Sequence, residues 1–425
     1  MKQLRTSVLL VALLASSAIA AKADPVLDWN AIAVATLIGQ AQSPFAQARF
    51  MAITQLAVFE AVNAITRDYE PYLGSVGAPA GARADAAAIS AAYHVLKNYF
   101  PGAPLLDGQY AAALAAIPPS QAKDDGIATG QAAATAMILN RVGDGAAPPQ
   151  FFTPPSTDPG VWQKTPSCPA AGGVNFQWQN IKPFGVPSAG GTDWIAAFEP
   201  GPPPDMTSAQ YARDYNEVKR VGNASASLAD RPQDRADVAR FYAAASPAFV
   251  FNSAAREVAT ALGRSMSENA RSLALLNMAS SDALVVSFWT KYNYVLWRPE
   301  TAIRRGDEDG NPKTDPDTTF VPYIVTPCFP SWPSNHGSGS NSAAEILRRE
   351  FGAGGHYITL TNAALGLTYH YTTFKQITDD IADARVYGGI HYRFDQDSGG
   401  ELGRNLATFV HKNNLRPVHP NNGQQ

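Results

Sequence analysis

Three short stretches in the last third of the chain carry residue types that could do chemistry on an anion. They span residues 291–299 (KYNYVLWRP), 333–336 (PSNH) and 385–395 (RVYGGIHYRFD). Together they supply a lysine, at least two arginines, two histidines, a serine, an aspartate and the start of a helix. Fixed cations and free helix N–H groups are what proteins use to hold tetrahedral oxyanions. We therefore expect a site for phosphate or for its mimic vanadate.

Lys291 and Arg298 are the first two candidate cations. They are seven residues apart, or two helical turns, so the spacing predicts that both project from nearly the same face. Two buried cations on one face are costly unless an anion lies between them. A solvated basic edge is the alternative, because most lysines and arginines stay in water. The intervening residues are mostly large and apolar, which favours a buried element.

The second stretch stands directly before a predicted helix at about residues 337–351. A helix start offers free backbone N–H groups and a positive dipole end. Main-chain donors and the Ser334 hydroxyl could therefore hold an anion, with His336 beside it as proton donor or acceptor. The alternative is a capping serine next to a surface histidine.

The third stretch adds Arg385, whose planar fork suits two oxygens of one oxyanion. His391 and Asp395 are four residues apart. On a helix the carboxylate would accept a hydrogen bond from one ring nitrogen and leave the other free to attack or to ligate. Gly388 and Gly389 weaken a continuous helix at this point. A surface His–Asp pair is the alternative.

The other histidines, His94, His356, His370, His411 and His419, have no comparable neighbours in the sequence, and we expect the last two to be solvated. The chain has no HExxH, CxxC or P-loop pattern. A zinc site or a nucleoside triphosphate site is therefore disfavoured.

Most of the chain has the apolar periodicity of helices, and strand signals are sparse. The predicted helices span about 46–64, 84–99, 126–141, 207–222, 235–245, 254–279, 282–297, 337–351, 376–387 and 400–412. Residues 143–204 and 305–333 are too rich in Pro, Gly and polar residues to be helical. The pattern predicts an all-α helical bundle with long Pro/Gly-rich loops.

The chain divides into three predicted regions. Residues 1–23 have the form of a secretory signal peptide, which predicts a secreted or periplasmic protein. Residues 24–206 form an N-terminal helical region that includes the Pro-rich excursion, at about 143–204. The excursion carries many aromatic residues, so we expect it to pack down rather than act as a flexible linker. Residues 207–425 form the bundle that carries the oxyanion site.

Charge and hydropathy exclude some partners. With 33 Lys+Arg and 36 Asp+Glu the net charge is −3, and removal of Lys2, Arg5 and Lys22 with the leader makes it −6. A mildly acidic protein argues against nucleic acid as a main partner. After the leader we find no uninterrupted apolar run long enough for stable membrane insertion. The sequence leaves a homo-oligomer open.

Cys168 and Cys328 are the two cysteines of a protein expected to be exported, so only one pairing is possible. A bridge would pin the chain around Cys168 near the second stretch. Two unpaired, buried thiols are the alternative, because the sequence does not supply the Cα separation that a disulfide needs.

In order and spacing, the three stretches resemble the signature of a superfamily. It unites type 2 phosphatidic acid phosphatases, bacterial class A acid phosphatases and vanadium-dependent haloperoxidases, and reads K-x6-R-P, P-S-G-H and S-R-x5-H-x3-D. Within it the chain is similar to secreted bacterial vanadium haloperoxidases, through segments at 59–73, 202–211, 288–294 and 390–395. The resemblance covers nearly the whole mature chain. It implies an all-α fold with the anion site in the C-terminal bundle.

The haloperoxidase resemblance also implies a role for each residue. His391 would be the vanadium ligand, Asp395 would orient it, and His336 would be the acid/base residue. Vanadate oxygens, or phosphate at the same site, would be held by the following residues: Lys291, Arg298, Arg385, Ser334 and the Asn335 backbone N–H. Lys291 would also polarise bound hydrogen peroxide. Halide would then be oxidised to hypohalous acid, which halogenates a small organic acceptor.

Two other functions share these residues. In a phosphatase acting on phosphate esters, His391 would attack phosphorus to form a phosphohistidine and His336 would protonate the leaving group. A non-catalytic phosphate-binding homologue is the third reading. It is favoured by two departures from the signature, since Asn335 replaces the usual Gly and Ala384 replaces the usual Ser.

Phe329 and Trp332 are the candidate halide pocket. Phe329 stands seven residues before His336, where chloride-oxidising members of the family carry Phe and bromide-specific members tend to carry His. The resemblance therefore implies an apolar halide site. Phe before Pro in an apolar run is also ordinary core.

Overall fold

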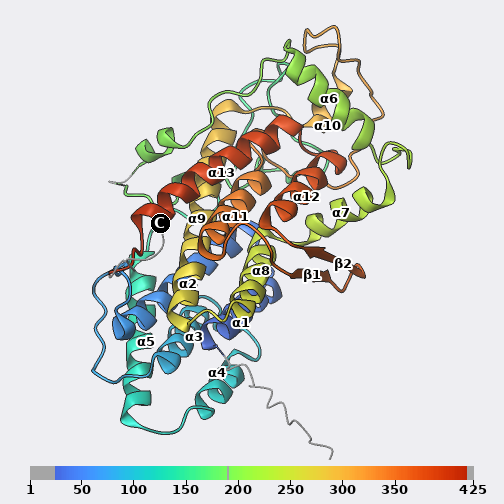
Figure 1. Ribbon diagram of the computed structural model, residues 1–425. Helices are drawn as coiled ribbons and strands as arrows, with labels where there is room; N and C mark the ends of the chain where they lie inside the picture. Colours follow the sequence, from blue (N-terminus) through green and yellow to red (C-terminus); the bar gives the residue numbers. More distant parts are fainter. Residues whose placement is uncertain (1–23, 189–190, 419–425) are drawn as a thin grey trace, which may run out of the picture.

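The protein is helical, and its one sheet among the described residues is a small hairpin (Figure 1). The computed structural model describes residues 24–188 and 191–418. The predicted signal peptide lies outside them. The predicted all-α class is confirmed. The elements, in chain order, are α1 (Pro25–Gly39), α2 (Pro44–Thr66), α3 (Ala84–Tyr99), α4 (Leu106–Ala115), α5 (Gln121–Asn140), η1 (Phe176–Asn180), η2 (Asp193–Ala197), α6 (Ala209–Val221), α7 (Gln233–Ala244), α8 (Pro247–Ala261), α9 (Met266–Tyr294), α10 (Pro299–Arg304), α11 (Asn335–Phe351), β1 (Ile358–Asn362), β2 (Leu367–Tyr371), α12 (Phe374–Tyr387) and α13 (Arg393–Asn413).

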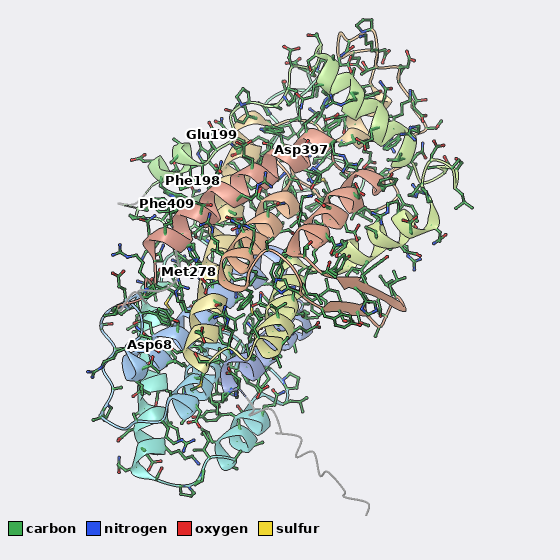
Figure 2. All side chains as sticks on the ribbon, viewed as in Figure 1. Asp68, Phe198, Glu199, Met278, Asp397 and Phe409 are labelled. Atoms are coloured by element: carbon green, nitrogen blue, oxygen red, sulfur yellow. A yellow bond between two sulfur atoms is a disulfide. The ribbon has the colours of Figure 1, made fainter. Side chains whose placement is uncertain are left out.

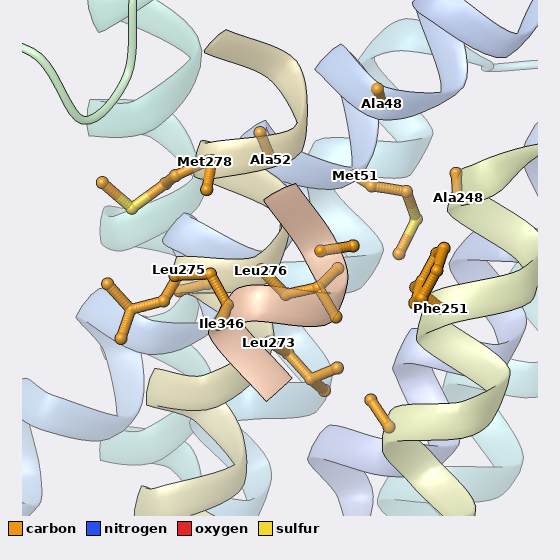
Figure 3. Packing of buried hydrophobic residues seen from close by; sticks show 14 of the residues in the cluster. Ala48, Met51, Ala52, Ala248, Phe251, Leu273, Leu275, Leu276, Met278 and Ile346 are labelled. Carbon is orange, nitrogen blue, oxygen red and sulfur yellow. The ribbon is translucent and has the colours of Figure 1, made fainter. Parts of the chain in front are cut away.

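Helix α9 is the central element and packs against α2, α11 and α13 (Figure 1). It begins at a capping box, in which Ser265 and Glu268 satisfy each other's backbone N–H groups. Its leucines and Met278 belong to the main apolar cluster, together with Met51 of α2 and Ile346 of α11 (Figure 3). Both α2 and α9 are long and apolar enough to cross a membrane, yet 83% and 94% of their apolar windows are buried inside the protein. They are therefore core helices.

Two predicted helices, 254–279 and 282–297, were wrong in their boundaries. The break lies between α8 and α9, where Gly263 has φ +63° and Ser265 caps the next helix. The serines at 280 and 281, which separate the two predicted helices, are buried inside α9. Small hydroxyl side chains fit a crowded helix interface, so they do not interrupt it.

Helices α11 and α13 approach each other closely, which brings their N-terminal ends together. Gly403 lies against the Ser338 backbone, and a Cβ at this position would overlap the Ser338 carbonyl oxygen. A Cβ at Gly399 would lie 2.6 Å from the Ser334 carbonyl oxygen. Any larger residue at these two positions would push the helices apart.

The Pro-rich excursion packs onto the bundle, as its aromatic residues predicted. Trp162, Trp178 and Trp194 are buried. Figure 2 labels Phe198 near Phe409 of α13, and their rings meet edge to face at 5.5 Å. Asp282 of α9 is a buried carboxylate. It accepts hydrogen bonds from the backbone N–H groups of Phe184 and Gly185 in the excursion, both at 2.7 Å.

Cys168 and Cys328 form a disulfide, with their Cα atoms 5.1 Å apart. The bridge ties the excursion to the loop that leads into α11. A backbone hydrogen bond of 2.9 Å from Val174 to the Cys328 carbonyl reinforces the same junction.

Several elements were not predicted from the sequence. α1 has a clear cap, since Asp24 accepts from the Val26 N–H at 2.8 Å and Pro25 follows it. The β1–β2 hairpin pairs Ile358 with Tyr371 in antiparallel register. α4 was also missed. The main apolar core draws residues from both predicted regions, and the division at 206/207 stays a prediction.

Candidate anion-binding active site

The three stretches converge where α9 ends and where α11 and α13 begin (Figure 1). Lys291 lies in the last turn of α9, which ends at Tyr294 because Val295 is left-handed, with φ +53°. Arg298 is extended before Pro299 and caps α10. The prediction that Lys291 and Arg298 share one helical face was therefore wrong, although the fold brings both to one site.

Lys291 is fully buried and its ammonium group is bound to the loop before α11. It donates to the carbonyls of Pro330 at 2.9 Å, of Ser331 at 2.7 Å and of Pro333. These three bonds use the three protons of the ammonium group. Burial, and then the positive charge of Arg298, lowers the pKa of Lys291. In this arrangement Lys291 holds the loop in place and adds positive charge to the site.

Arg298 and Arg385 each keep a buried donor without a protein partner in the described part of the chain. Arg298 donates from Nε to the Phe329 carbonyl at 2.7 Å and from Nη1 to the Ile390 carbonyl at 2.9 Å, but its Nη2 is unpartnered. Arg385 donates from Nη1 to the Tyr242 carbonyl at 2.9 Å, and its Nε is unpartnered. Burial lowers the pKa of Arg298 to about 9 and that of Arg385 to about 10.

His391 and Asp395 meet at 2.7 Å, between Nδ1 and Oδ2. Their contact was predicted, but the predicted helix around both was not found. Tyr392 caps α13, His391 precedes the cap, and Asp395 reaches back from the first turn to the Tyr392 N–H at 3.2 Å. With Nδ1–H donated to Asp395, His391 Nε2 carries the lone pair. It lies 3.0 Å from Arg298 Nη1.

Asp395 has one further partner, Ser331, which the sequence reasoning missed. The Ser331 hydroxyl donates to Asp395 Oδ2 at 2.5 Å and lies 3.4 Å from His391 Nδ1. Burial raises the pKa of Asp395 to about 6, against the hydrogen bond from Ser331 and the charge of Lys291. Nothing in the local pattern singles out Ser331, because it lies in an irregular loop.

Helix α11 begins close to its predicted start. Ser334 caps it by accepting from the Gly337 N–H at 3.1 Å, so the capping part of the alternative is found, and the anion-binding role stays a prediction. Asn335 is the first helical residue and its φ is not positive, so the Gly usual at this place is not required here. Its side chain turns to α9, where Ser287 donates to Asn335 Oδ1 at 2.6 Å.

His336 is half-buried at the edge of this cluster. Within the parts of the chain that the structure describes, its ring makes no hydrogen bond. Burial, and then the charges of Arg385, Lys291 and Arg298, lowers the pKa of His336, so the ring is neutral at pH 7. A neutral imidazole can take or give a proton to a bound molecule.

Three buried cations therefore act on His391, and Asp395 is the one carboxylate that the described residues bond to its ring. Their exposed fractions are 0% for Lys291, 0% for Arg298 and 4% for Arg385. Unpaired buried charge is costly, so this arrangement calls for an anion among the free donors. It would lie beside His391 Nε2, where Arg298 Nη1 already points.

Comparison with known proteins agrees with this geometry. The family profile of the VCPO second helical-bundle domain matches residues 271–420, which include all three stretches. The fold is similar to that of the first bacterial vanadium-dependent iodoperoxidase to be solved. The TM-score is 0.77 and the identity 26%, over 93% of this chain and 98% of that one. The match over residues 271–420 and the shared fold support membership of the vanadium haloperoxidase superfamily.

Other matches in this superfamily are more distant in sequence. An apo-type bacterial vanadium-dependent chloroperoxidase has the same fold, with a TM-score of 0.70 and 15% identity over 87% of this chain and 92% of that one. No curated protein matches the sequence.

The donor set of this site fits vanadate. The free donors, Arg298 Nη2 and Arg385 Nε, are charged and buried, and His391 Nε2 offers a lone pair to a metal centre. Asp395 on the other ring nitrogen is the carboxylate partner that fixes a ligating histidine. The described residues contain no group of three His, Cys, Asp or Glu that could hold a bare metal ion. The arrangement thus suits an oxyanion carried by one histidine.

The two candidate halide residues lie in different apolar clusters. The Phe329 ring lies under the cations, 5.3 Å from Lys291 Nζ and 5.0 Å from Arg298 Cζ. Trp332 donates from its indole to the Gly201 carbonyl at 3.0 Å and packs on Phe394. Phe329 is therefore beside the anion site, and Trp332 supports the α13 side of the fold.

His411, which we expected to be solvated, is instead bonded inside this haloperoxidase fold. Its Nε2 lies 2.8 Å from Glu350 Oε1, and Arg271 and Ser272 bind the same carboxylate. His411 lies on the side of α13 that faces Glu350 of α11, so the polar sequence around it was misleading. His419 lies outside the described residues.

Proposed function

We propose that the protein is a vanadate-dependent haloperoxidase that oxidises a halide with hydrogen peroxide to hypohalous acid. The observation that carries this proposal is the buried excess of positive charge around His391 Nε2, with donors of Arg298 and Arg385 left free. The 26% identity with a bacterial vanadium-dependent iodoperoxidase, over nearly the full length of both chains, supports it.

Each residue would have a defined task. His391 would hold vanadate through Nε2, since Asp395 takes up Nδ1–H. Arg298 and Arg385 would neutralise its oxygens, and the Asn335 N–H and the Ser334 hydroxyl at the start of α11 would add donors. Bound vanadate would supply the activation of hydrogen peroxide towards halide.

His336 and Lys291 would act around this group. Neutral His336 would accept or release a proton at a ring nitrogen. Lys291 would keep the loop from Pro330 to Pro333 closed and would contribute its charge. Phe329, under Lys291 and Arg298, supports a halide site on the apolar side of the anion.

The same geometry favours phosphate ester hydrolysis as a second candidate. His391 Nε2 carries a lone pair, and its other nitrogen is held by a carboxylate, which is the arrangement of an activated nucleophile. The cations would then stabilise charge on the phosphoryl oxygens.

One metal-free preparation, split in two, separates these functions. One half is loaded with orthovanadate and assayed for peroxide-dependent oxidation of iodide, bromide and chloride, and the other is assayed for phosphate ester hydrolysis. We expect halide oxidation that appears only with vanadate. Ester hydrolysis that vanadate inhibits, without halide oxidation, would establish the phosphatase instead.

Two controls complete the experiment. The variant His391→Ala should lose whichever activity is found, and unchanged turnover would contradict the role of this residue. Retained phosphate binding without either activity would leave the third reading, a non-catalytic phosphate-binding homologue.

We also propose that the protein works outside the cytoplasm. The leader-like form of residues 1–23 and the Cys168–Cys328 disulfide support this location, because disulfides persist in oxidising compartments.

A further inference from the structure

A cavity of about 440 Å³ opens beside the anion site, and His336 forms part of its wall. Its other walls come from the end of α1, the start of α2, the junction of α7 and α8, and the end of β1 with the turn that follows it. The volume lies in the range of small-molecule sites, which is roughly 300–1,000 Å³. One organic molecule of one or two rings would fit.

The described residues that line this cavity include no Lys, Arg, Asp or Glu. The three buried cations do not line the cavity, but their charges act on His336, so the cavity presents a neutral surface next to a strongly positive site. A charged occupant would find no counter-charge on the cavity walls. The occupant that fits is therefore neutral.

The side chain of Gln47, a polar residue of the wall, has its partners within the protein. Gln47 Oε1 accepts from the Ser246 hydroxyl at 2.5 Å, and Gln47 Nε2 donates to the Gln42 carbonyl at 2.8 Å. Ile38, Phe249 and small alanines supply much of the remaining wall. Apolar contact and shape would thus hold the occupant, while the His336 ring remains available to it.

We propose that this cavity binds a neutral, electron-rich aromatic molecule as halogen acceptor and that halogen transfer takes place there. The inference rests on the proposed function, which supplies hypohalous acid at the site. Because hypohalous acid is an electrophile, the acceptor must donate an electron pair from carbon. The carbon–halogen bond forms, the halogen–oxygen bond breaks, and the proton lost from carbon leaves with hydroxide as water. Neutral His336 can carry that proton.

Transfer inside the cavity has a signature that free hypohalous acid lacks. Naphthol and its sulfonated, negatively charged analogue serve as the two probes. Their product ratio in direct competition is first measured with reagent hypohalite. We expect the protein to shift this ratio at least several-fold towards the neutral naphthol, and we expect calorimetry to show saturable naphthol binding to the vanadate-loaded protein.

Filling the cavity tests its role. Ala244 lines it on α7 and is exposed, so Ala244→Trp should fill it without touching the anion site. The matched control is Ala353→Trp, at an exposed alanine in a separate groove between α11 and α12. We expect Ala244→Trp to lose naphthol binding and to return the product ratio to that of reagent hypohalite. Its iodide oxidation without organic acceptor should stay unchanged, and Ala353→Trp should behave as wild type.

The outcomes separate the two proposals. Iodide oxidation together with the reagent product ratio in the wild type would overturn acceptor binding and leave the haloperoxidase proposal standing. The same loss of selectivity in both tryptophan variants would also overturn it. Absence of iodide oxidation from the vanadate-loaded wild type would overturn the proposed function, and this inference with it.

Discussion

Asp395 Oδ2 accepts from three donors: the His391 ring, the Ser331 hydroxyl and the Tyr392 N–H. Its other oxygen has no partner within the described residues. The orientation of the His391 ring therefore depends on one carboxylate oxygen, which Ser331 holds from the loop and Tyr392 holds from α13. Ser331 is a positioning residue in this arrangement, because it reaches His391 through Asp395.

We expect Ser331→Ala to weaken the binding of vanadate and of phosphate by about 10- to 100-fold, the usual effect of losing a partner behind a ligating histidine. Nitrogen NMR of the His391 ring should show a mixture of tautomers in place of one protonated at Nδ1. Ser342→Ala is the control, since this buried α11 hydroxyl has no hydrogen-bond partner among the residues that the structure describes. Equal anion affinity in the two variants would contradict the positioning role.

At the residue scale, the sequence predicted which side chains meet but not how they are held. The residues of the three stretches could be identified because their types and spacing are specific. The shared face of Lys291 and Arg298 failed because the left-handed Val295 and the Pro299 constraint end the helix between them. Ser331 could not be predicted, since its contact with Asp395 joins residues 64 apart through tertiary folding.

At the scale of elements, the anion site depends on how closely α11 and α13 approach. Ser334 and His336 start one helix, His391 and Asp395 flank the start of the other, and Gly403 allows their backbones to touch. The helices themselves could be predicted from periodicity, but this crossing could not. The glycines of α13 look like helix weaknesses until the partner helix is known.

We expect Gly403→Ala to destabilise the protein by about 1–3 kcal/mol, the usual cost of overpacking, and to weaken phosphate binding because the two helix starts move apart. Thermal unfolding and calorimetry with inorganic phosphate measure the two effects. Gly108→Ala is the matched control on α4, where an added Cβ meets nothing within 4 Å. It should be neutral or stabilising, by up to about 1 kcal/mol. Unchanged phosphate affinity in Gly403→Ala would show that the close approach does not set the site.

The β1–β2 hairpin is a second feature at this scale that was not predicted from the sequence. Its strands, ITLTN and LTYHY, do alternate apolar with polar residues, but over only five positions each, so the strand signal is short. Packing against α8, and against Phe241 and Tyr242 of α7, gives the hairpin a buried side. Its turn then forms one wall of the cavity beside His336.

At the scale of the whole molecule, a buried polar cluster joins α9, α11 and α13 away from the anion site. Glu350 of α11 binds Arg271 at 2.6 Å and Ser272 at 2.7 Å on α9, and His411 at 2.8 Å on α13. Burial alone would raise the pKa of Glu350. The hydrogen bonds and charges of His411 and Arg271, with Ser272, outweigh it and lower the pKa from 4.5 to about 2.

This shift makes stability depend on pH. A carboxyl group whose pKa is lower in the folded state stabilises the fold above its unfolded pKa, and that stability is lost as pH falls towards the folded pKa. Glu350 should therefore contribute about 3 kcal/mol at pH 7, lost between about pH 4.5 and pH 2. We expect Glu350→Gln to lower the unfolding free energy at pH 7 and to flatten its acid dependence. Parallel curves for the two proteins across that range would refute this.

The buried excess of positive charge has a consequence for the surroundings in which the protein works. Arg298 and Arg385 offer donors to any tetrahedral oxyanion, and nothing in these two side chains distinguishes vanadium from phosphorus at its centre. The occupant is then decided by supply, through mass action among the oxyanions present. Under the proposed function, abundant phosphate would compete with vanadate for the site, and scarce phosphate would leave the site to vanadate. Phosphate supply would then set the fraction of the protein that carries vanadate.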